Sequence, residues 1–369
     1  MTRAAVLTAL GGPLTVRDDV EVQSPREGEV RVAVVASGVC HSDLSMRDGI
    51  LPIPLPAVLG HEGAGVVERV GPGVEGLAPG DHVVISWVPQ CGGCFYCARG
   101  QPHLCQHADA VLITGGLLDG TPRLRLDGSE LFQMQGTGTF SEVTVVPAWS
   151  LVKVPPDLDL TVAALLGCAV LTGVGAALNT ADIATGATVV VVGCGGVGLN
   201  VVQGAHIAGA GEIVAVDVHR TKLAMAERMG ATTTVDASAG DPVAAVRDLT
   251  DQRGADVAFD TAGLATTIHQ TIDMTRRGGQ AVLVGIPPLD VMITLPAMIG
   301  VILAERRITG CWAGSSDIRR DIPRLVELYR RGELLLDDLV TRRIALDEVD
   351  GAFAAMVAGE VARSVIVHR

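Results

Sequence analysis

The pattern of hydrophobic and polar positions divides the chain into parts with different structure. The N-terminal part contains short valine-rich runs that glycine or proline separates, such as Glu29–Ala36, Gly65–Val70 and His82–Ser86. Short β-rich runs bounded by turn residues are typical of strands joined by loops. This part therefore predicts a partly open β-barrel or a folded sheet, with the polar residues carried by its loops.

From Thr188 onward the apolar runs are β-branched, and helical patterns lie between most of them. Strands that are apolar throughout and alternate with helices indicate a parallel sheet that helices cover on both faces. We therefore expect a doubly wound α/β domain in this part. The predicted strands are Thr188–Val192, Ile213–Val216, Thr233–Val235, Val257–Phe259 and Ala281–Val284.

The pattern changes again after Trp312. Ser316–Arg331 places apolar residues at helical spacing, so it predicts an amphipathic helix. Two short strands and a further helix at Asp347–Ala358 are expected to follow. Because 369 residues exceed what one hydrophobic core usually supports, we expect two domains.

Composition narrows the partners and the compartment. A net charge of −13 argues against a nucleic acid or an anionic membrane, because both require a basic surface. The apolar runs are shorter than the ~20 residues of a membrane span, and the N-terminus lacks a signal-peptide pattern. Without a secretion signal, the eight cysteines favour metal ligands or buried thiols over disulfides. We therefore expect a cytoplasmic protein.

A glycine-rich motif, GCGGVG at Gly193–Gly198, follows a predicted strand and opens a helical pattern. Its glycines permit a tight turn and let a pyrophosphate approach the helix N-terminus. Asp217 ends the next strand, where a carboxylate accepts hydrogen bonds from ribose hydroxyls and repels a 2′-phosphate, so NAD is favoured over NADP. Arg220 is a counterargument, and Lys222 could also reach the ribose. The cofactor-binding residues predicted here are Gly193, Gly195, Gly196, Gly198, Asp217 and Lys222.

Four cysteines lie close together at Cys91, Cys94, Cys97 and Cys105. Four thiolates form a closed tetrahedral zinc site, which leaves no position for a substrate. Coincidental cysteines or a redox pair would not account for three evenly spaced thiols followed by a fourth. The sequence therefore predicts a structural zinc site.

Three further residues, Cys40, His61 and Cys168, are candidate metal ligands. Taken alone, each is more often a buried thiol or a structural histidine. Two thiolates and one imidazole leave a fourth zinc position open, and this set is already known from alcohol dehydrogenase. Placing Cys40, His61 and Cys168 together at one metal therefore follows that known ligand set and not their spacing in the sequence.

Several motifs together resemble one family. They are GVCHSD (Gly38–Asp43), GHEGAGVVERVGPGV (Gly60–Val74), CGGCFYCARGQPHLC (Cys91–Cys105), LLGCAVLTGVGAA (Leu165–Ala177) and VVGCGGVG (Val191–Gly198). In this order the chain resembles the zinc-containing alcohol dehydrogenases of the medium-chain dehydrogenase/reductase family, over essentially its whole length. The resemblance implies a GroES-like catalytic domain of residues 1–170 and 313–369 and a Rossmann NAD-binding domain of residues 171–312.

The resemblance also implies roles near the catalytic zinc. Cys40, His61 and Cys168 would bind the metal, and water or the substrate oxygen would take the fourth position. Glu62 is similar to a carboxylate that can approach the metal, and Asp43 to the one that orients the histidine. The alcohol proton would pass to Ser42. The catalytic residues implied are Cys40, Ser42, His61, Glu62 and Cys168.

Contacts with the cofactor follow from the same resemblance. Thr172 and Val197 would lie near the nicotinamide, and Arg363 would reach a cofactor phosphate. His41 stands where arginine is common, so a weaker and pH-dependent pyrophosphate contact is a hypothesis here. Ser45 replaces a histidine that continues the proton relay in some members, so the last step could run through water.

The implied substrate is a hydrophobic primary alcohol or its aldehyde, with aromatic and allylic compounds favoured. Trp87 suggests a bulky apolar wall close to the zinc, although either tryptophan of the pocket could instead fill a core. The pocket positions are Leu51, Trp87, Ala110, Met134 and Trp312, with Gln135 beside them.

The leading interpretation is a dehydrogenase of the EC 1.1.1 type with two zinc ions per chain and exchangeable NAD. Two enzymatic alternatives stay open, one with permanently bound NAD and one that oxidises a formaldehyde–thiol adduct. A catalytically silent binding protein is the non-enzymatic alternative. The long segment between Cys105 and Gly136 resembles dimeric members, so a homodimer is favoured over a homotetramer.

Overall fold

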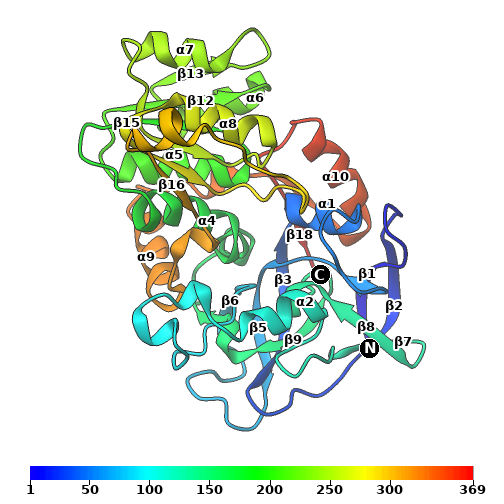
Figure 1. Ribbon diagram of the computed structural model, residues 1–369. Coiled ribbons are helices and arrows are strands. Elements are labelled where there is room, and N and C mark those ends of the chain that lie inside the picture. The colour runs from blue at the N-terminus through cyan, green and yellow to red at the C-terminus, as the bar shows by residue number, and fades with distance from the viewer. Residues whose placement is uncertain (369) are drawn as a thin grey trace. The chain divides into compact units, whose positions relative to one another are not determined.

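The computed structural model describes residues 1–368, which form two compact units (Figure 1). The first unit comprises Met1–Ala169, Asp317–Tyr329 and Leu336–Arg369, and the second comprises Val170–Ser316 and Arg330–Leu335. Compared with the ranges expected from the sequence, the second unit also includes residues 313–316 and 330–335.

A small closed barrel lies in the first unit, with strand order β1-β2-β7-β8-β4. Its core contains Leu7, Val20, Leu131 and Phe140, all without exposed surface. The sequence predicted a partly open barrel, whereas these strands close on themselves. The barrel strands are β1 (Thr2–Leu7), β2 (Thr15–Val22), β4 (Ala57–Val58), β7 (Leu124–Leu126) and β8 (Ser129–Gln133).

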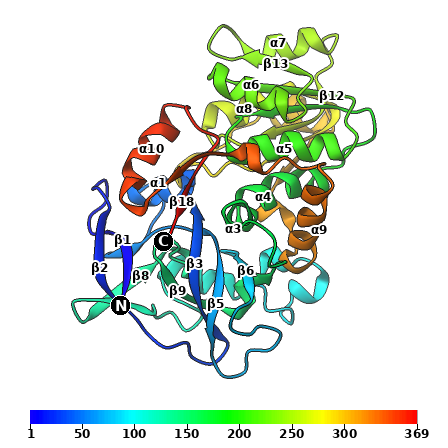
Figure 2. The same ribbon diagram turned by 180° about the vertical axis from the view of Figure 1, so that it is seen from behind.

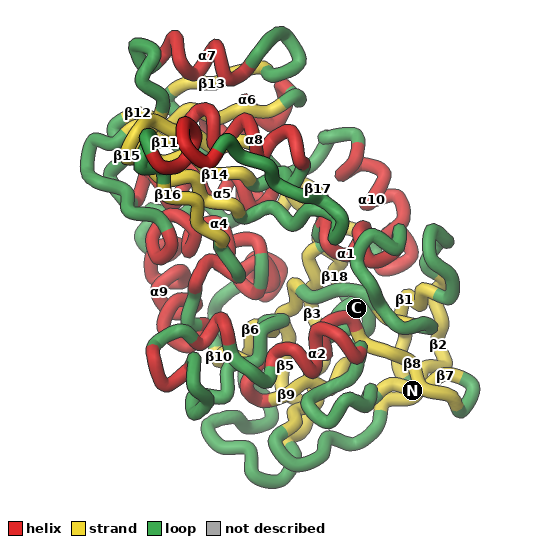
Figure 3. The backbone as a smooth tube through the Cα atoms, in the orientation of Figure 1, coloured by secondary structure: helices red, strands yellow, loops and turns green. Residues whose placement is uncertain are grey.

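A seven-stranded sheet forms the rest of the first unit, in the order β10-β6-β5-β3-β18-β17, with β9 also paired to β3 (Figure 3). Strand β18 comes from the C-terminal part of the chain, and its Ile366 lies opposite Ser37 of β3. Residues far apart in sequence therefore share this sheet. Its strands are β3 (Glu29–Gly38), β5 (Glu62–Val70), β6 (His82–Ile85), β9 (Val143–Pro147), β10 (Leu151–Lys153), β17 (Val340–Ile344) and β18 (Arg363–Val367).

The second unit contains a six-stranded sheet of order β13-β12-β11-β14-β15-β16, and its pairs are parallel. Helices connect its consecutive strands, as Figure 2 shows from behind. The strand order reverses between β11 and β14, next to the glycine motif. The strands are β11 (Thr188–Val192), β12 (Glu212–Asp217), β13 (Thr233–Asp236), β14 (Ala255–Asp260), β15 (Thr275–Leu283) and β16 (Arg307–Gly310).

The helices are short, and several have irregular ends. Among residues 1–368, no single helix is both long and apolar enough to cross a membrane; one pair of consecutive helices, Leu160–Gly167 and Ala169–Thr180, reaches that length and composition together but bends by 55°. The α-helices are α1 (His41–Arg47), α2 (Ala108–Thr114), α3 (Leu160–Ala163), α4 (Ala169–Gly175), α5 (Gly196–Ile207), α6 (Arg220–Arg228), α7 (Pro242–Leu249), α8 (Ala265–Met274), α9 (Ile318–Arg330) and α10 (Val349–Val357).

Short 3-10 and π turns supplement these elements. They include η1 (Cys97–Arg99) and η2 (Pro102–Leu104) in the cysteine loop, η3 (Met134–Gly136), η4 (Ala148–Ser150), η5 (Ala164–Gly167), η6 (Ala176–Thr180), η7 (Ala297–Ile302), η8 (Ala313–Ser315), η9 (Asp337–Leu339) and η10 (Leu346–Glu348).

Most of the predicted strands and helices of the second half of the chain are present, with bounds that differ by a few residues. The strand predicted at Thr188–Val192 has the same bounds as β11, and the helix predicted at Ser316–Arg331 begins at Ile318 in α9. The sequence extended β15 to Val284, one residue too far. A single helix was expected at Asp347–Ala358, but its first turn belongs to η10 and only then does α10 begin.

Candidate metal centres and cofactor site

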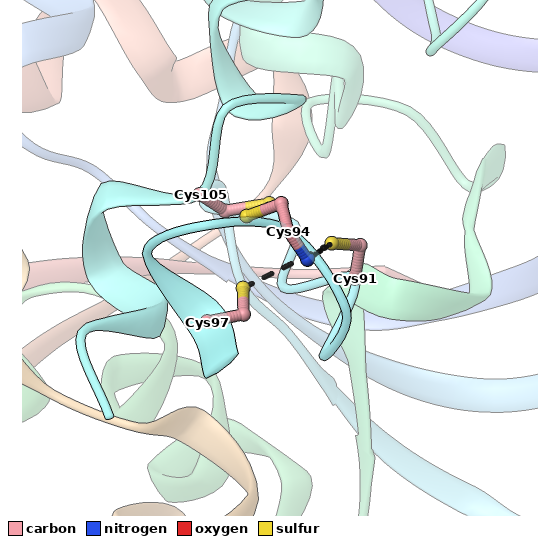
Figure 4. A group of neighbouring side chains, drawn as sticks. All are labelled: Cys91, Cys94, Cys97 and Cys105. Atoms are coloured by element: carbon pink, nitrogen blue, oxygen red, sulfur yellow. Dashed lines mark hydrogen bonds between the residues drawn. The ribbon is translucent and has the colours of Figure 1, made fainter. Parts of the chain in front are cut away.

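Cys91, Cys94, Cys97 and Cys105 point toward one another, as Figure 4 shows. The Sγ atoms of Cys91 and Cys97 are 3.9 Å apart, and those of Cys94 and Cys105 are 4.0 Å apart. A tetrahedron with Zn–S bonds of about 2.3 Å requires sulfur atoms about 3.8 Å apart. The four thiols therefore fit a structural zinc ion.

Backbone N–H groups of the cysteine loop stabilise the charged sulfur of Cys91 and Cys94. The backbone N–H groups of Gly93 and Cys94 donate to the Cys91 Sγ at 3.4 and 3.3 Å. Hydrogen bonds from the backbone of Cys97 and Gln106 lower the pKa of Cys94 to about 6. Burial instead raises the pKa values of Cys97 and Cys105, so these two thiols would lose their protons as the metal binds.

Helix α9 anchors the start of this cysteine loop through Gln90. The Arg319 Nη2 donates to the Gln90 carbonyl at 3.0 Å, and the Ile318 N–H donates to the Gln90 Oε1 at 3.1 Å. On the other side, the Gln90 N–H donates to the carbonyl of Trp149 at 3.1 Å. The residue before Cys91 is therefore fixed on two sides.

A second group brings together Cys40, His61, Glu62 and Cys168, whose ligand atoms all lie within 4.8 Å of one another. Cys40 follows β3 and His61 precedes β5. These two strands pair antiparallel with Gly38 opposite Glu62, so the end of one meets the start of the other. Strand register therefore explains why the two ligands meet although 20 positions of chain lie between them in numbering.

Asp43 fixes the imidazole of this group. Its Oδ1 lies 3.0 Å from the His61 Nδ1, and the same carboxylate accepts the N–H groups of Cys40 at 2.8 Å and Gly60 at 3.1 Å. When the Nδ1–H of His61 donates to Asp43, the unprotonated Nε2 is left as the metal-binding nitrogen. Two sulfurs and this nitrogen fit a zinc ion with an open fourth position.

Glu62 forms a buried ion pair beside the same ligands. Its Oε1 lies 2.9 Å from the Arg363 Nη2, which also lies 3.4 Å from the Cys40 Sγ, while its Oε2 is buried without a hydrogen-bond partner. Burial raises the pKa of Glu62 to about 7, although the positive charge of Arg363 opposes the shift. The pairing was not foreseen from the sequence, because 301 positions separate the partners and no local pattern links them.

The glycine motif of the second unit is shaped for a close-lying ligand. A Cβ on Gly198 would lie 1.8 Å from the Gly193 carbonyl oxygen, so only glycine allows this turn. Around Gly195, by contrast, a Cβ would meet no atom within 4 Å. Helix α5 starts at Gly196, so the open space lies at a helix N-terminus, where a pyrophosphate is favoured.

Asp217 stands beside that motif at the end of β12. Its Oδ2 accepts the N–H of Cys194 at 2.7 Å and its Oδ1 accepts the N–H of His219 at 2.8 Å. Arg220 is largely exposed and pairs with Asp236 at 3.0 Å. Because the carboxylate of Asp236 already pairs with the Arg220 guanidinium, Arg220 is less available to bind the 2′-phosphate of NADP.

Family comparisons agree with this arrangement. Residues 26–156 match the model of the alcohol dehydrogenase GroES-like domain, and residues 196–331 match that of the zinc-binding dehydrogenases. The NDMA-dependent alcohol dehydrogenase of Amycolatopsis methanolica is 41% identical over 100% of this chain and 99% of the relative. The chain belongs to the zinc-containing alcohol dehydrogenases of the medium-chain family.

Other relatives extend the comparison. The S-(hydroxymethyl)glutathione dehydrogenase of Paracoccus denitrificans is 39% identical, with 100% of both chains covered. The solved benzyl alcohol dehydrogenase of Acinetobacter calcoaceticus has a TM-score of 0.93 at 33% identity, covering 100% of this chain and 99% of its own. These comparisons confirm the family, the GroES-like and Rossmann-type fold, and the zinc- and NAD-dependent oxidoreductase class that the sequence predicted.

The other catalytic and cofactor-binding residues predicted for this alcohol dehydrogenase differ in burial and in the unit to which they belong. Ser42 is half-buried, with its Oγ 4.0 Å from the Cys40 Sγ, whereas His41 is exposed at the start of α1. Arg363 lies buried against Glu62 within the first unit, so its predicted phosphate contact would require it to serve a second partner. The remaining cofactor candidates lie in the second unit, with Thr172 on α4 and Lys222 on α6.

The residues predicted to line the substrate pocket also differ in burial and in the unit to which they belong. The buried Trp87 meets His61 edge to face, with ring centroids 6.5 Å apart. Leu51 and Ala110 are half-buried in the first unit, and Trp312 is half-buried in the second. Met134 has no exposed surface and packs in the barrel core. Its place in the substrate pocket stays a prediction, as does that of the likewise buried Trp87.

Proposed function

We propose that this alcohol dehydrogenase oxidises hydrophobic primary alcohols, aromatic and allylic ones above all, and reduces the matching aldehydes. The main support is the ligand set of Cys40, His61 and Cys168, which leaves a fourth metal position for the substrate, together with the Trp87 ring against His61. An apolar aromatic wall favours a flat hydrophobic substituent next to the reacting carbon. The likeness to a benzyl alcohol dehydrogenase supports the same class.

Zinc at this site would polarise the substrate oxygen, and NAD would accept the hydride. Asp43 holds His61 in the tautomer that a metal requires. Ser42 is the nearest hydroxyl on α1 and would take the alcohol proton. Arg363 neutralises Glu62 and faces the Cys40 sulfur, so it keeps a buried carboxylate and a thiolate together without excess negative charge.

NAD would be held by the second unit, at the carboxyl edge of its parallel sheet. Its pyrophosphate would lie over the Gly193–Gly198 turn and its ribose against Asp217, with Lys222 nearby. Val197 and Thr172 are proposed near the nicotinamide, and His41 and Arg363 near the phosphates. Asp217 is the residue expected to disfavour NADP.

A substrate panel tests this function. Zinc-loaded protein is assayed with NAD and NADP against ethanol, butanol, cinnamyl alcohol and benzyl alcohol, and kcat/KM is compared. We expect the aromatic and allylic alcohols to exceed ethanol by at least about tenfold, since each added buried methylene is worth ~1 kcal/mol. A preference for ethanol would contradict the proposal.

Two alternatives keep specific support from relatives. The NDMA-dependent relative is named for an external electron acceptor, and the Paracoccus relative for a glutathione adduct of formaldehyde. NAD that stays with the protein through gel filtration, with turnover only when nitrosodimethylaniline is added, would replace exchangeable NAD by bound NAD. Formaldehyde oxidation that requires a thiol would instead support the adduct as substrate.

We further propose a cytoplasmic homodimer, formed through the second unit. Its residues 286–303 expose an unusual number of large apolar side chains. An exposed apolar patch of this kind is typical of a protein–protein interface, and a second copy of the chain is its proposed partner. The exposed residues are Ile286, Leu289, Met292, Ile293, Met298, Ile299, Ile302 and Leu303.

A further inference from the structure

Asp260, the last residue of β14, has no exposed surface and is not explained by the glycine motif or by the zinc sites. It lies opposite Val192, the residue before Gly193, in the pairing of β14 with β11. The strand order reverses between these two strands. In open parallel sheets, ligands bind outside the carboxyl ends of the strands at such a reversal. Asp260 therefore stands where the cofactor is expected.

The carboxyl group of Asp260 is only half satisfied. Its Oδ2 accepts the N–H of Gly263 at 3.0 Å, while its Oδ1 is buried without a hydrogen-bond partner. Burial raises the pKa of Asp260, against the opposing effect of the Thr267 hydroxyl and of backbone N–H groups. A buried acceptor oxygen without a partner is costly, so the place of Asp260 needs an explanation.

Two loops meet at the backbone of this residue. The N–H groups of Val284 and Gly285 donate to the Asp260 carbonyl oxygen at 2.8 and 2.9 Å. A Cβ on Gly285 would lie 2.2 Å from the Gly263 nitrogen, so the two loops touch backbone to backbone. Gly263 itself has a φ of +70°, and it is the residue that the Asp260 side chain holds.

The neighbouring Thr261 extends the connection to the glycine motif. Its Oγ1 donates to the Gly193 carbonyl oxygen at 2.5 Å, and its N–H donates to the Val192 carbonyl oxygen at 2.9 Å. The turn at Gly193, the turn at Gly263 and the loop at Gly285 are thus joined through two consecutive residues. A change at Asp260 can reach all three.

We propose that Asp260 is a positioning residue for NAD, which holds the turns at Gly193, Gly263 and Gly285 in the arrangement that the dinucleotide needs. This proposal rests on the use of NAD by the enzyme. The dinucleotide as a whole depends on all three loops, whereas its adenosine half depends mainly on Asp217. Loss of the Asp260 carboxyl should therefore weaken NAD more than AMP.

The test measures dissociation constants of NAD and AMP by calorimetry on protein freed of nucleotide. The variants are Asp260→Leu, which cannot accept the Gly263 N–H, and Asp260→Asn, which keeps an acceptor oxygen. We expect Asp260→Leu to weaken NAD about tenfold, with AMP changed less than about threefold, and Asp260→Asn to bind NAD nearly as the wild type does. The melting temperature without nucleotide is measured in parallel.

Unchanged NAD affinity in Asp260→Leu would overturn the proposal, as would equal losses for NAD and AMP. Should Asp260→Leu not fold, Asp260→Ala is judged by the same ratio of NAD to AMP affinities. A wild-type protein that binds neither nucleotide would refute NAD use itself. A wild type that binds NAD normally, with unchanged variants, would refute only the role of Asp260.

Discussion

At the scale of single residues, Arg123 shows how much a buried charge depends on its partners. Its side chain is 1% exposed, and its guanidinium donates to both oxygens of Glu29, at 2.9 and 2.5 Å. Asp119 accepts a further bond at 2.7 Å. Burial opposes its charged form, but hydrogen bonds from Arg123 and Thr121 together with the charge of Arg123 lower the pKa of Asp119 to about 2. The cluster joins the start of β3 to the region before β7.

Removing the charge of Glu29 should destabilise the first unit strongly. In Glu29→Gln the guanidinium loses its closest negative partner but keeps Asp119, so the expected loss is that of a charged hydrogen bond, about 1.5–3 kcal/mol. Urea unfolding followed by circular dichroism would measure the loss. Glu130→Gln changes an exposed carboxylate on β8 and serves as the control. Equal stability of the two variants would contradict the assignment.

His368 should make stability depend on pH. Burial lowers its pKa from 6.5 to about 4, and its Nε2 lies 3.3 Å from the Thr139 carbonyl oxygen. Arg3, Glu142 and Asp347 line the same small cavity. Because the folded state resists protonation, the unfolded state binds more protons between these pH values. Stability should therefore be full above pH 6.5 and fall as the pH drops toward 4, by roughly 1–3 kcal/mol.

The variant His368→Gln tests this origin of the pH dependence. The slope of unfolding free energy against pH should be smaller between pH 4 and 6.5 than in the wild type. His206→Gln changes an exposed histidine of the second unit and should keep the wild-type slope. An unchanged slope in His368→Gln would assign the acid sensitivity to other groups.

The role of a residue was predictable where it belongs to a local sequence motif. It was not predictable where the partners of the residue come together only through tertiary packing. The four cysteines of the structural site are close in sequence, and their geometry follows from their spacing. Glu29, the closest partner of Arg123, lies 94 positions away, and Arg363, the partner of Glu62, lies 301 positions away, so no local pattern predicts either pair. The packing of Met134 in the barrel core was not predicted for the same reason, since it depends on strands that meet only in the folded barrel.

At the scale of elements, the apolar β-branched strands were predictable, because burial on both faces leaves a continuous hydrophobic run. Strand β11 was placed without error, and β12, β13 and β14 to within two residues at either end, whereas β16 was not predicted. Strand β15 begins at Thr275, well before the predicted Ala281, because its first residues are polar and resemble a loop. The short helix α2 was not predicted, since its exposed apolar residues follow no clear period.

The cysteine loop should behave as an element that zinc stabilises. Cys97→Ser removes one of four ligands, so zinc content should fall from two ions per chain toward one, and the melting temperature should drop. Substrate preference should change little, because the closed site offers no position for a substrate. Atomic absorption and calorimetry would measure both effects.

Cys311→Ser is the matched control for this variant. Cys311 is a buried thiol outside both ligand groups, and its sulfur accepts the hydroxyl of Thr180 at 3.3 Å. Its replacement should keep two zinc ions. Two ions in Cys97→Ser, or one in Cys311→Ser, would contradict the ligand assignment.

At the scale of the whole molecule, the exposed apolar segment of the second unit predicts the assembly. Ile299 is 72% exposed in η7. If a second copy covers it, Ile299→Asp should shift the protein from dimer to monomer, with a dissociation constant raised at least about tenfold, since a buried unpaired charge costs several kcal/mol. Sedimentation velocity over a range of concentrations would show the change.

The control is Ile113→Asp, because Ile113 is 73% exposed on α2 in the first unit. It should leave the dimer intact. A wild-type monomer at all concentrations would refute the dimer, and dissociation by Ile113→Asp alone would place the interface on the other unit.

The C-terminal strand β18 has a consequence for the synthesis of this protein. The second unit is almost one continuous stretch of the chain, so it can emerge from the ribosome and fold while translation continues. The sheet of the first unit stays incomplete until β18 has been synthesised, because β3 lacks this one of its neighbours and Glu62 lacks Arg363. A chain truncated before β18 would therefore carry an exposed sheet edge and an unpaired buried acid, the features that mark a product for degradation.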